Sequence, residues 1–382
     1  MNALTEEELE ILFEEKSEKA CLSIYLPTAK AGQEILQSPI KLKNALKEAK
    51  KKLLDYGLSG QEANDFLKPA RKLIDDTMFW QHQKEGLAIF IAPDQFKYYR
   101  LPLKFDTSVM VDTKFNIKPL IPYSNGNSTF YLLALSQNEN RLLKCTQNRV
   151  EEIEVAEVPD SLEDTLQYDD GEVQIQSHAS NTGGKMIFHG QGADKEDHKE
   201  DIKRYLRQID QGLKKELDGE SPLMVMSVDY LFHMYKECNS YPHLLGDKEL
   251  EGNPENLTLD ELHKKGRDVI DALYVEEMKE AVDKYRDALG GERSISEYEE
   301  IVPAAYNGQV ELLFLPPDVE KWGLFDKSKN DVFINNQAQK DSELFNLAAL
   351  YTVQNGGKVY TLPKEDGIFD KAPMAALLRY QY

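Results

Sequence analysis

The chain has 382 residues, of which 41% are hydrophobic and 30% are charged, and its formal net charge is −21. Its length suggests two or three domains, and its composition is that of a folded globular protein. The acidic charge argues against broad, non-specific binding of nucleic acid, because phosphate contacts require clustered Lys and Arg, but it leaves room for contacts made by one basic surface.

The sequence also indicates the cellular compartment of the protein. Its three cysteines are scattered and odd in number, which is typical of free thiols in a reducing compartment. No apolar run approaches the roughly 20 residues that span a bilayer, and the acidic, helically spaced N-terminus does not resemble a signal peptide. We therefore expect a cytoplasmic protein that does not contact a membrane.

The first segment, residues 1–124, predicts an N-terminal α/β domain. CLSIYLP is typical of a buried strand, and residues 39–60 have helical spacing with Gly57 as a stop. A second helix is predicted over 60–80, in which Pro69 indicates a kink or a new helix start. The pattern EGLAIFIAPDQFKYYRLPL predicts a hairpin, and the polar run YSNGNST predicts the end of the domain.

The second segment, residues 128–219, predicts an antiparallel meander followed by a long helix. TFYLLALSQ, NRLLKCTQ and RVEEIEV are typical of three short strands separated by tight polar turns. A polar stretch at 168–184 follows, and loops of this length are either functional or mobile. The helix has Asp194 as its predicted cap and keeps one apolar face for docking on the sheet, formed by Ile202, Tyr205, Leu206, Ile209, Leu213 and Leu217.

The third segment, residues 221–382, alternates strands with helices, which predicts a parallel or mixed α/β sheet. PLMVMSV, VELLFLP and the end of SELFNLAALYTVQNGGKVYTLP are predicted strands, and DYLFHMYKEC is a predicted helix. A long helix over 259–289 begins with a capping box formed by Thr258 and Glu261. Together the three segments predict an α/β (α+β multidomain) protein.

The common catalytic and metal-binding motifs are absent from the sequence. It contains neither a complete phosphate-binding loop nor a G-x-G-x-x-G after a strand, and no G-x-S-x-G marks a serine nucleophile. His233, Cys238 and His243 lie close together in sequence, but the four-ligand pattern of a structural zinc site is missing. We therefore expect no cofactor and no metal.

The sequence His189-Gly190-Gln191-Gly192 closes the polar stretch before the long helix of the second segment. Gly190 and Gly192 permit positive φ, so the backbone can present Gln191 to another molecule. The neutral amide of Gln191 can orient water or stabilise an oxyanion without titrating. A Gly-Gln-Gly sequence is also a common turn between a strand and a helix, so the residues alone leave both interpretations open.

Basic residues cluster around this loop and helix, and we predict that they contact RNA backbone: Lys185, Lys195, Lys199, Lys203, Arg204 and Arg207. Several acidic residues interleave with them, so a solvated helix face with internal ion pairs is the alternative. Glu196 and Asp197 in the first turn of the helix disfavour a phosphate at the helix N-terminus itself.

The order of these elements resembles a known family. FYLLALSQNENRLLKCTQNRVEEIEV, a polar loop ending in Gly-Gln and an amphipathic helix resemble the middle domain of the archaeal–eukaryotic class I peptide-chain release factors, and most of all their bacterial relatives. CLSIYLPT, FWQHQKEGLAIFIAP and SPLMVMSVDYLFHMYKECNSYPHLLG are similar to the first and third domains of those bacterial proteins. The resemblance implies an RNase H-like middle domain and a C-terminal α/β domain like those of Pelota and of kink-turn-binding ribosomal proteins.

The resemblance also implies a function. In the family a Gly-Gly-Gln loop promotes hydrolysis of peptidyl-tRNA on the ribosome, and Gly190 and Gln191 match its second and third residues, with His189 at the first. The catalytic residues that it implies are therefore Gln191, Gly190 and His189, acting only in the context of the ribosome. The ribosome and tRNA are the expected partners, with a protein partner of the C-terminal domain as a further option.

Codon reading is not expected. Asn116-Ile117-Lys118 is similar to the Asn-Ile-Lys-Ser motif of the eukaryotic factors, but Pro119 follows in place of serine, and we interpret the similarity as chance. Ribosome rescue therefore fits better than codon-specific termination. Two alternatives stay open: a non-catalytic RNA- or ribosome-binding adaptor in which the loop is only structural, and a hydrolase of a small ester, for which the sequence shows no nucleophile or metal.

Overall fold

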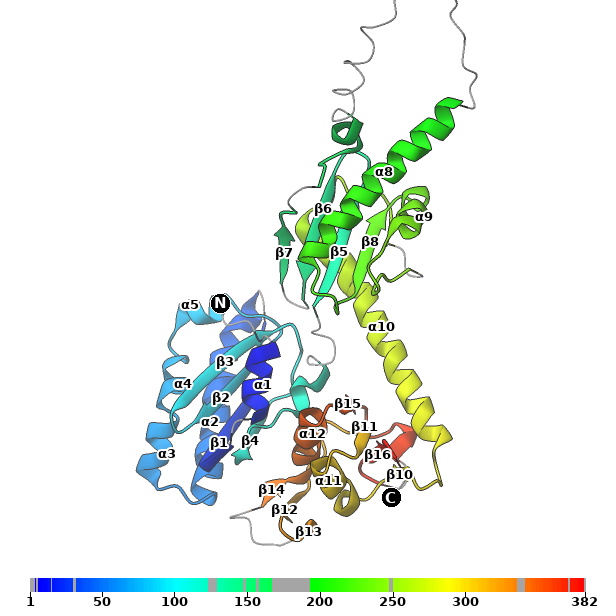
Figure 1. Ribbon diagram of the computed structural model, residues 1–382. Helices are drawn as coiled ribbons and strands as arrows, with labels where there is room; N and C mark the ends of the chain where they lie inside the picture. Colours follow the sequence, from blue (N-terminus) through cyan, green and yellow to red (C-terminus); the bar gives the residue numbers. More distant parts are fainter. Residues whose placement is uncertain are drawn as a thin grey trace, which may run out of the picture. The chain divides into compact units, whose positions relative to one another are not determined.

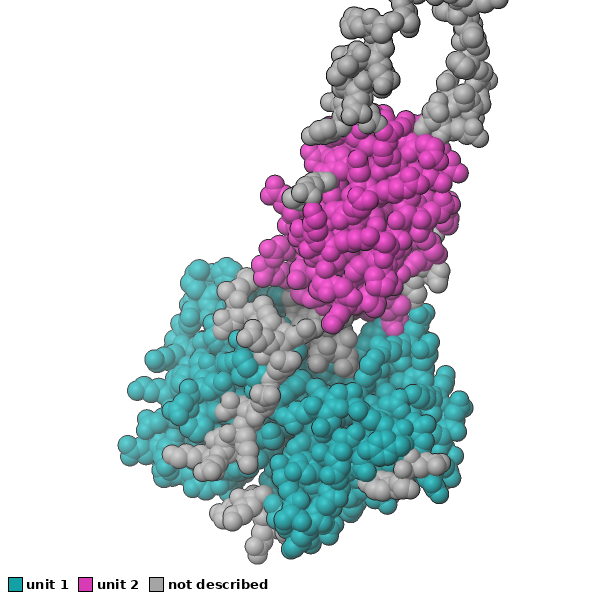
Figure 2. Space-filling view, in the orientation of Figure 1, with its two compact units in different colours: residues 1–126, 274–382 teal, residues 127–273 magenta. Residues whose placement is uncertain are grey.

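The computed structural model describes residues 4, 6–14, 16–29, 32–122, 129–146, 149–155, 158–166, 193–246, 250–334, 341–369 and 372–380. The chain forms two compact units (Figure 2). Unit 1 contains Met1–Gly126 and Tyr274–Tyr382, and unit 2 contains Asn127–Leu273. Unit 2 is thus inserted, along the sequence, between the two parts of unit 1.

The N-terminal part of unit 1 is an antiparallel sheet with strand order β3-β2-β1-β4 (Figure 1). Its strands are β1 (Lys16–Pro27), β2 (Gly86–Ala92), β3 (Gln95–Leu101) and β4 (Ser108–Lys114). The remaining elements are α1 (Glu6–Glu14), η1 (Gln33–Gln37), α2 (Ser38–Asp55), α3 (Gly60–Phe66), α4 (Lys68–Lys72), α5 (Thr77–Gln81) and η2 (Lys118–Leu120). The hairpin predicted around Pro93 is confirmed, since Ala92 pairs with Gln95.

Pro69 begins a new helix, as one of the two predicted options. The predicted helix over 60–80 is divided into α3, α4 and α5, and Pro69 lies in the first turn of α4. Proline has no N–H to donate, so this position leaves no helical hydrogen bond unmade. The helices α2 to α5 bury their apolar faces, including Leu42, Leu46 and Trp80, against one face of the sheet.

The C-terminal part of unit 1 has a mixed sheet, as predicted, with strand order β10-β16-β11-β15. Its strands are β10 (Ser294–Ile295), β11 (Val310–Leu315), β15 (Lys358–Thr361) and β16 (Ala375–Leu378), and β11 pairs parallel to β15. A second, three-stranded sheet contains β12 (Trp322–Asp326), β13 (Asp331–Phe333) and β14 (Ser342–Glu343). The helices are α11 (Tyr298–Tyr306), α12 (Leu344–Gln354) and η4 (Gly367–Phe369).

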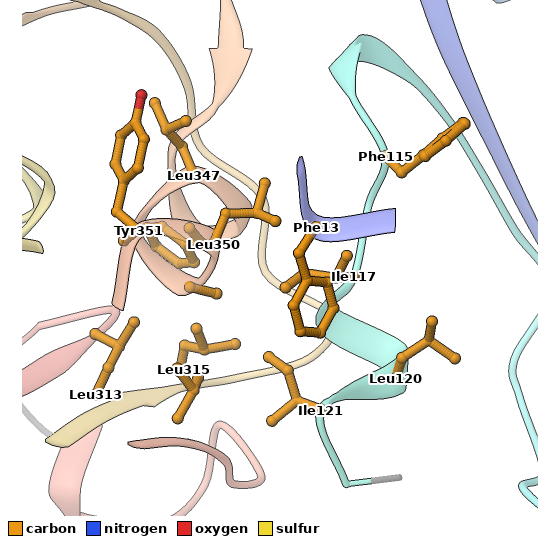
Figure 3. Packing of buried hydrophobic residues seen from close by; sticks show 14 of the residues in the cluster. Phe13, Phe115, Ile117, Leu120, Ile121, Leu313, Leu315, Leu347, Leu350 and Tyr351 are labelled. Carbon is orange, nitrogen blue, oxygen red and sulfur yellow. The ribbon is translucent and has the colours of Figure 1, made fainter. Parts of the chain in front are cut away.

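The two parts of unit 1 share one hydrophobic core. Figure 3 shows Phe13 of α1 packed with Ile117 and Ile121 on one side and with Leu315 of β11 and Leu350 of α12 on the other. All five side chains are nearly or completely buried. The amide of Gln354 also donates to the Phe13 carbonyl at 3.0 Å. Residues more than 200 positions apart in the sequence therefore complete the same core.

A buried ion pair lies beside this core. Lys118 Nζ and Glu343 Oε2 are 2.9 Å apart, and their side chains are only 1% and 0% exposed. Lys118 also donates to the Val319 carbonyl at 2.8 Å. The Glu343 carboxylate accepts from the backbone N–H groups of Lys321, Phe345 and Asn346, and so caps α12. Lys118 belongs to the sequence that resembles the codon-reading motif, and its burial gives it a structural role.

Unit 2 is a five-stranded sheet with order β7-β6-β5-β8-β9. The predicted meander is confirmed as β5 (Phe130–Leu135), β6 (Asn140–Cys145) and β7 (Val150–Ile153), and β8 (Leu223–Ser227) and β9 (Leu250–Glu251) add to it in parallel. The helices are α8 (Ala193–Glu216), α9 (Asp229–Cys238) and α10 (Leu259–Asp287), and the α/β (α+β multidomain) class is confirmed.

The structure divides the chain differently from the boundary predicted between 219 and 221. Leu132 pairs with Met224 and Leu133 with Val225 in the parallel ladder of β5 and β8, so backbone hydrogen bonds join β8 to the sheet of unit 2. The division lies between residues 273 and 274, within α10, so unit 1 contains both the N-terminal and the C-terminal part of the chain.

The capping box predicted at the start of α10 is confirmed. Thr258 N donates to the Glu261 carboxylate at 2.9 Å, and Glu261 N donates to the Thr258 hydroxyl at 3.3 Å.

We predict that Lys118→Met lowers the free energy of unfolding of unit 1 by about 3–5 kcal/mol, because it leaves the Glu343 carboxylate buried without its counterion. Denaturant unfolding of the full chain measures the change. The control is Arg149→Met, which removes a pair with Glu151 whose side chains are 69% and 57% exposed. Its expected cost is below about 1 kcal/mol, and an equal cost for both variants would contradict the role of the buried pair.

Asp112 gives a separate, pH-dependent prediction. Burial, together with the negative charge of Glu343, raises the pKa of the Asp112 carboxyl from 3.8 to about 6, against hydrogen bonds from the Glu343 and Thr113 N–H groups that lower it. The folded state thus binds this proton more tightly than the unfolded chain, so the contribution of Asp112 to stability is present below pH 4 and is lost as pH rises through about 6.

Accordingly, the free energy of unfolding of the wild type minus that of Asp112→Asn is expected to fall by about 1–3 kcal/mol between pH 4 and pH 7. Taking the difference removes the titration of all other carboxylates that the two proteins share. Urea unfolding at several pH values measures it, and a difference that stays constant or rises with pH would show that Asp112 titrates normally in the folded protein.

Candidate functional site

The predicted catalytic residues His189, Gly190 and Gln191 lie outside the described residues, as does Lys185. The structure does describe the chain on both sides of them. Residues 158–166 lie before this stretch and α8 begins immediately after it, at Ala193. The site is therefore defined by the two ends that carry the Gly-Gln sequence.

Helix α8 has 24 residues and is amphipathic, as predicted. Ile202, Leu206 and Ile209 are almost completely buried against the sheet, and the Tyr205 hydroxyl donates to the Ser136 carbonyl at 3.1 Å. By contrast, residues 198–200 are all exposed, and the N-terminal turns of α8 extend beyond the sheet (Figure 1). The start of α8 lies roughly 14 Å along the axis from Ile202, so the Gly-Gln sequence joins the projecting end of an anchored helix.

The upstream end, residues 158–166, is also attached to unit 2. The Asn140 side chain donates to the Pro159 carbonyl at 2.7 Å, and Leu162 N donates to the Gln137 carbonyl at 2.8 Å. Leu162 is buried in the same core as α8, and the Thr165 hydroxyl is 3.4 Å from the Gln208 amide oxygen on that helix. The segment before this stretch and helix α8 after it are thus packed in the same hydrophobic core of unit 2.

Gly212 explains how closely the upstream segment approaches α8. A Cβ at this position would lie 2.1 Å from Val158 Cγ2 and 3.3 Å from Val155 Cγ1. Only glycine leaves room for Val158 against the helix backbone. Glycine is otherwise unfavourable in a helix interior, by about 1 kcal/mol relative to alanine, so its presence here fits the close approach of the segment.

Four of the predicted RNA-binding residues follow one row of α8 with a spacing of four, which places them on the same helix face: Lys195, Lys199, Lys203 and Arg207. Lys199 and Arg207 are exposed, Lys203 is 3.4 Å from Glu237 of α9, and the Lys195 side chain lies outside the described part of the chain. Arg204 is off this row and lies 2.8 Å from Asp201.

The charges of α8 are balanced, which limits what this row can bind. The helix contains seven acidic and seven basic residues, and two of the predicted cations are already in ion pairs. Burial raises the pKa of the Cys238 thiol on α9, and the positive charges of Arg207 and Lys203 oppose that effect. Their cationic ends therefore lie near α9. The alternative of an ion-paired, solvated face is realised for Lys203 and Arg204, while Lys199 and Arg207 stay available.

The zinc candidates of the sequence do not form a common site within the described residues, where no group of three or more His, Cys, Asp or Glu side chains is placed to hold a metal ion. His233 Nε2 lies 3.1 Å from Asp229 on the same helix, and the His243 ring packs against Tyr241. Likewise, none of the described helices is both long and apolar enough to cross a bilayer.

The five-stranded sheet of unit 2 and the chain on both sides of the Gly-Gln sequence belong to one stretch of the sequence that matches a known family. Residues 130–272 match the family described as bacterial archaeo-eukaryotic release factor family 7, and this match nearly coincides with unit 2, residues 127–273. The resemblance inferred from the sequence is thereby confirmed for residues 130–272, which match a family of bacterial relatives of the archaeal–eukaryotic release factors. No curated protein matches the chain.

Solved structures give distant likenesses. An archaeal Pelota in a ribosome-bound model with ABCE1 is 12% identical, with 100% of this chain and 96% of that chain covered and a TM-score of 0.38. Dom34 of S. cerevisiae is 14% identical (78% and 79% covered, TM-score 0.36), and the archaeal termination factor aRF1 is 12% identical (97% and 96% covered, TM-score 0.24). TM-scores below 0.5 support neither a shared arrangement of domains nor a shared activity.

Gly212→Ala tests the anchoring of the upstream segment. We expect it to lower the free energy of unfolding of unit 2 by about 1–3 kcal/mol, because Val158 must move, although alanine favours the helix. Gly60→Ala is the matched control, since nothing lies within 4 Å of its added Cβ, and it should leave stability unchanged or raise it by up to about 1 kcal/mol. Denaturant unfolding of both variants measures the contrast, and equal effects would contradict the close packing at Gly212.

Proposed function

We propose that the protein is a translation-linked release or ribosome-rescue factor that places its Gly-Gln loop at the ester of a peptidyl-tRNA on the ribosome. The observation that carries this proposal is the family match over 130–272, because these residues include Gly190 and Gln191. In addition, the loop directly precedes α8, which is the order of elements in the release-factor family.

The chemistry of Gln191 suits this role. Its amide is neutral and offers one acceptor and two donors, so it can orient a water molecule toward the ester carbonyl and donate to the oxyanion that develops there. Water adds to the carbonyl carbon, the bond to the tRNA oxygen breaks, and that oxygen leaves with a proton. Gln191 is not a base strong enough to remove a proton from water. The rate enhancement would therefore come from positioning the water molecule against the ester, and the reaction would take place only on the ribosome.

The partners in this proposal are the ribosome and a peptidyl-tRNA, and the cytoplasm is where they meet. Lys199 and Arg207, which are exposed on α8, are the described residues of this helix that are available to contact RNA backbone, and Lys199 is the nearer of the two to the loop. Lys185 and Lys195 are further candidates. A protein partner of the C-terminal part of the chain belongs to the same proposal. Codon-specific termination does not, because Lys118 is buried.

A non-catalytic adaptor is the second candidate, and one observation favours it. His189 occupies the position of the first glycine of the family loop, and histidine adopts positive φ less readily than glycine. In this case the loop is only a turn, and the protein binds the ribosome or RNA without promoting hydrolysis.

Peptide release from stalled ribosomes separates the two candidates. We expect the wild type to release labelled peptide from peptidyl-tRNA and Gln191→Ala and Gly190→Ala to do so at least about 100-fold more slowly, as for the loss of an oxyanion donor. Gln211→Ala is the matched control, because Gln211 is an exposed glutamine on α8 outside the loop, and it should release peptide at the wild-type rate.

Co-sedimentation with ribosomes completes the experiment. Equal release by all four proteins, or no release above background, would contradict the catalytic role. Ribosome binding without release would then identify an adaptor, and absence of both would contradict any direct ribosomal function.

A further inference from the structure

A basic surface lies in the N-terminal part of unit 1, far in sequence from the predicted RNA-binding residues of α8. Residues 38–72 contain nine basic and four acidic residues, a net charge of +5 within a chain whose net charge is −21. Helix α2 alone carries six lysines and two acidic residues. This segment therefore opposes the charge of the rest of the protein.

The packing of α2 decides which of its lysines face solvent. Leu42, Leu46 and Leu53 bury one face of the helix against the sheet. Lys43, Lys47 and Lys51 follow at intervals of four on the opposite face, and all three are exposed. They span roughly 12 Å along the helix axis. The main apolar face of α2 is thus already occupied, and the row of three ammonium groups lies on its exposed side, together with Ile40 and Leu54, which are 59% and 42% exposed.

Helix α4 extends this row into a surface. It packs in the same helical layer, with Leu67 and Ala70 buried in the core that also holds α2, while Lys68, Arg71 and Lys72 are exposed. We call the six exposed cations the lysine face: Lys43, Lys47, Lys51, Lys68, Arg71 and Lys72.

The cations of the lysine face have few competing partners. Within the part of the chain that the structure describes, none of the six forms an ion pair, and Arg71 donates to the neutral side chain of Asn64 at 3.1 Å. Lys52 behaves differently, since it points toward the sheet, lies 3.2 Å from Glu48 and donates to the Val109 carbonyl at 2.6 Å. In this respect the lysine face differs from α8, whose Lys203 and Arg204 are already paired.

We propose that the lysine face binds the phosphate backbone of RNA without reading its sequence. Protein interfaces are depleted in Lys and enriched in aromatic residues, and neither α2 nor α4 contains an aromatic residue. A membrane-surface helix inserts a continuous apolar face, but the continuous apolar face of α2 is buried in the protein, and only Ile40 and Leu54 of this helix are exposed large hydrophobic residues. Phosphate contacts, in contrast, need only clustered Lys and Arg, so RNA is the partner that fits best. The proposal does not depend on catalysis by Gln191.

A binding assay on the full chain tests the proposal, with a labelled structured RNA hairpin as the probe and salt varied from 50 to 200 mM. Lys43→Gln/Lys47→Gln/Lys51→Gln should weaken binding on the order of 50-fold near 0.15 M salt and reduce the slope of log K against log salt by about 2, as expected for three lost phosphate contacts. Glutamine is a good helix former, and circular dichroism checks that α2 remains folded.

Two further variants make the test specific. Lys264→Gln/Lys265→Gln/Lys279→Gln removes the same charge from exposed positions on α10 and should change affinity less than 3-fold. Lys68→Gln/Arg71→Gln/Lys72→Gln probes α4 independently and should weaken binding by at least 10-fold. Equal losses for the α2 and α10 variants would show that only net charge matters, and would overturn the proposal.

The remaining outcomes are equally decisive. Failure of the wild type to bind the hairpin, or an unchanged affinity of the α2 variant, would overturn the proposal. So would lysine-dependent binding to vesicles containing phosphatidylserine in place of RNA, which would identify a membrane surface as the partner. Because the peptide-release assay uses Gln191→Ala and this assay does not, failure of one proposal is distinguishable from failure of the other.

Discussion

The ion pair between Lys118 and Glu343 is the constraint on which the organisation of unit 1 depends. Two charges withdrawn from water destabilise a protein unless their geometry is good and their other hydrogen bonds are made. Here both conditions hold. The Lys118 ammonium group donates a further hydrogen bond to the Val319 carbonyl, and the Glu343 carboxylate accepts hydrogen bonds from the N-terminal N–H groups of α12. The segment after β4 and the start of α12 must therefore meet in one arrangement.

This arrangement explains why unit 2 is an insertion. Asn346 accepts from Ile117 N at 2.8 Å and donates to the Phe115 carbonyl at 2.9 Å, which ties α12 to the backbone just before η2. The chain then leaves unit 1 near 126 and returns at 274. The core of unit 1 is thus built from both ends of the chain, and unit 2 has its own sheet and its own hydrophobic clusters.

Local patterns in the sequence predicted most of the helices and strands, and the interactions between distant residues explain what they missed. Strand β8 looked like the start of a third domain because nothing in its own residues encodes parallel pairing with β5, about 90 residues earlier. The burial of Lys118 could not be predicted from local sequence either, since its partner is more than 200 residues away.

For the site, α8 and its basic residues could be predicted from the sequence, but the pairing of Lys203 with Glu237 depends on how α9 packs. The lysines of α2 were visible too, yet their common exposed face follows only from the side that Leu42 and Leu46 bury.

The shared core of unit 1 also has a consequence for synthesis of the chain. Phe13, Ile117 and Ile121 are buried by residues of β11 and α12, which are made roughly 200 residues later. At about 5–20 residues per second, the ribosome needs on the order of 10–40 s to supply them. During that time the N-terminal sheet can form and bury one face under α2 to α5. On its other face α1 can pack, but the apolar surface that β11 and α12 later cover stays exposed. We therefore expect the N-terminal part of the nascent chain to bind a chaperone that covers this apolar surface until the last hundred residues have been translated.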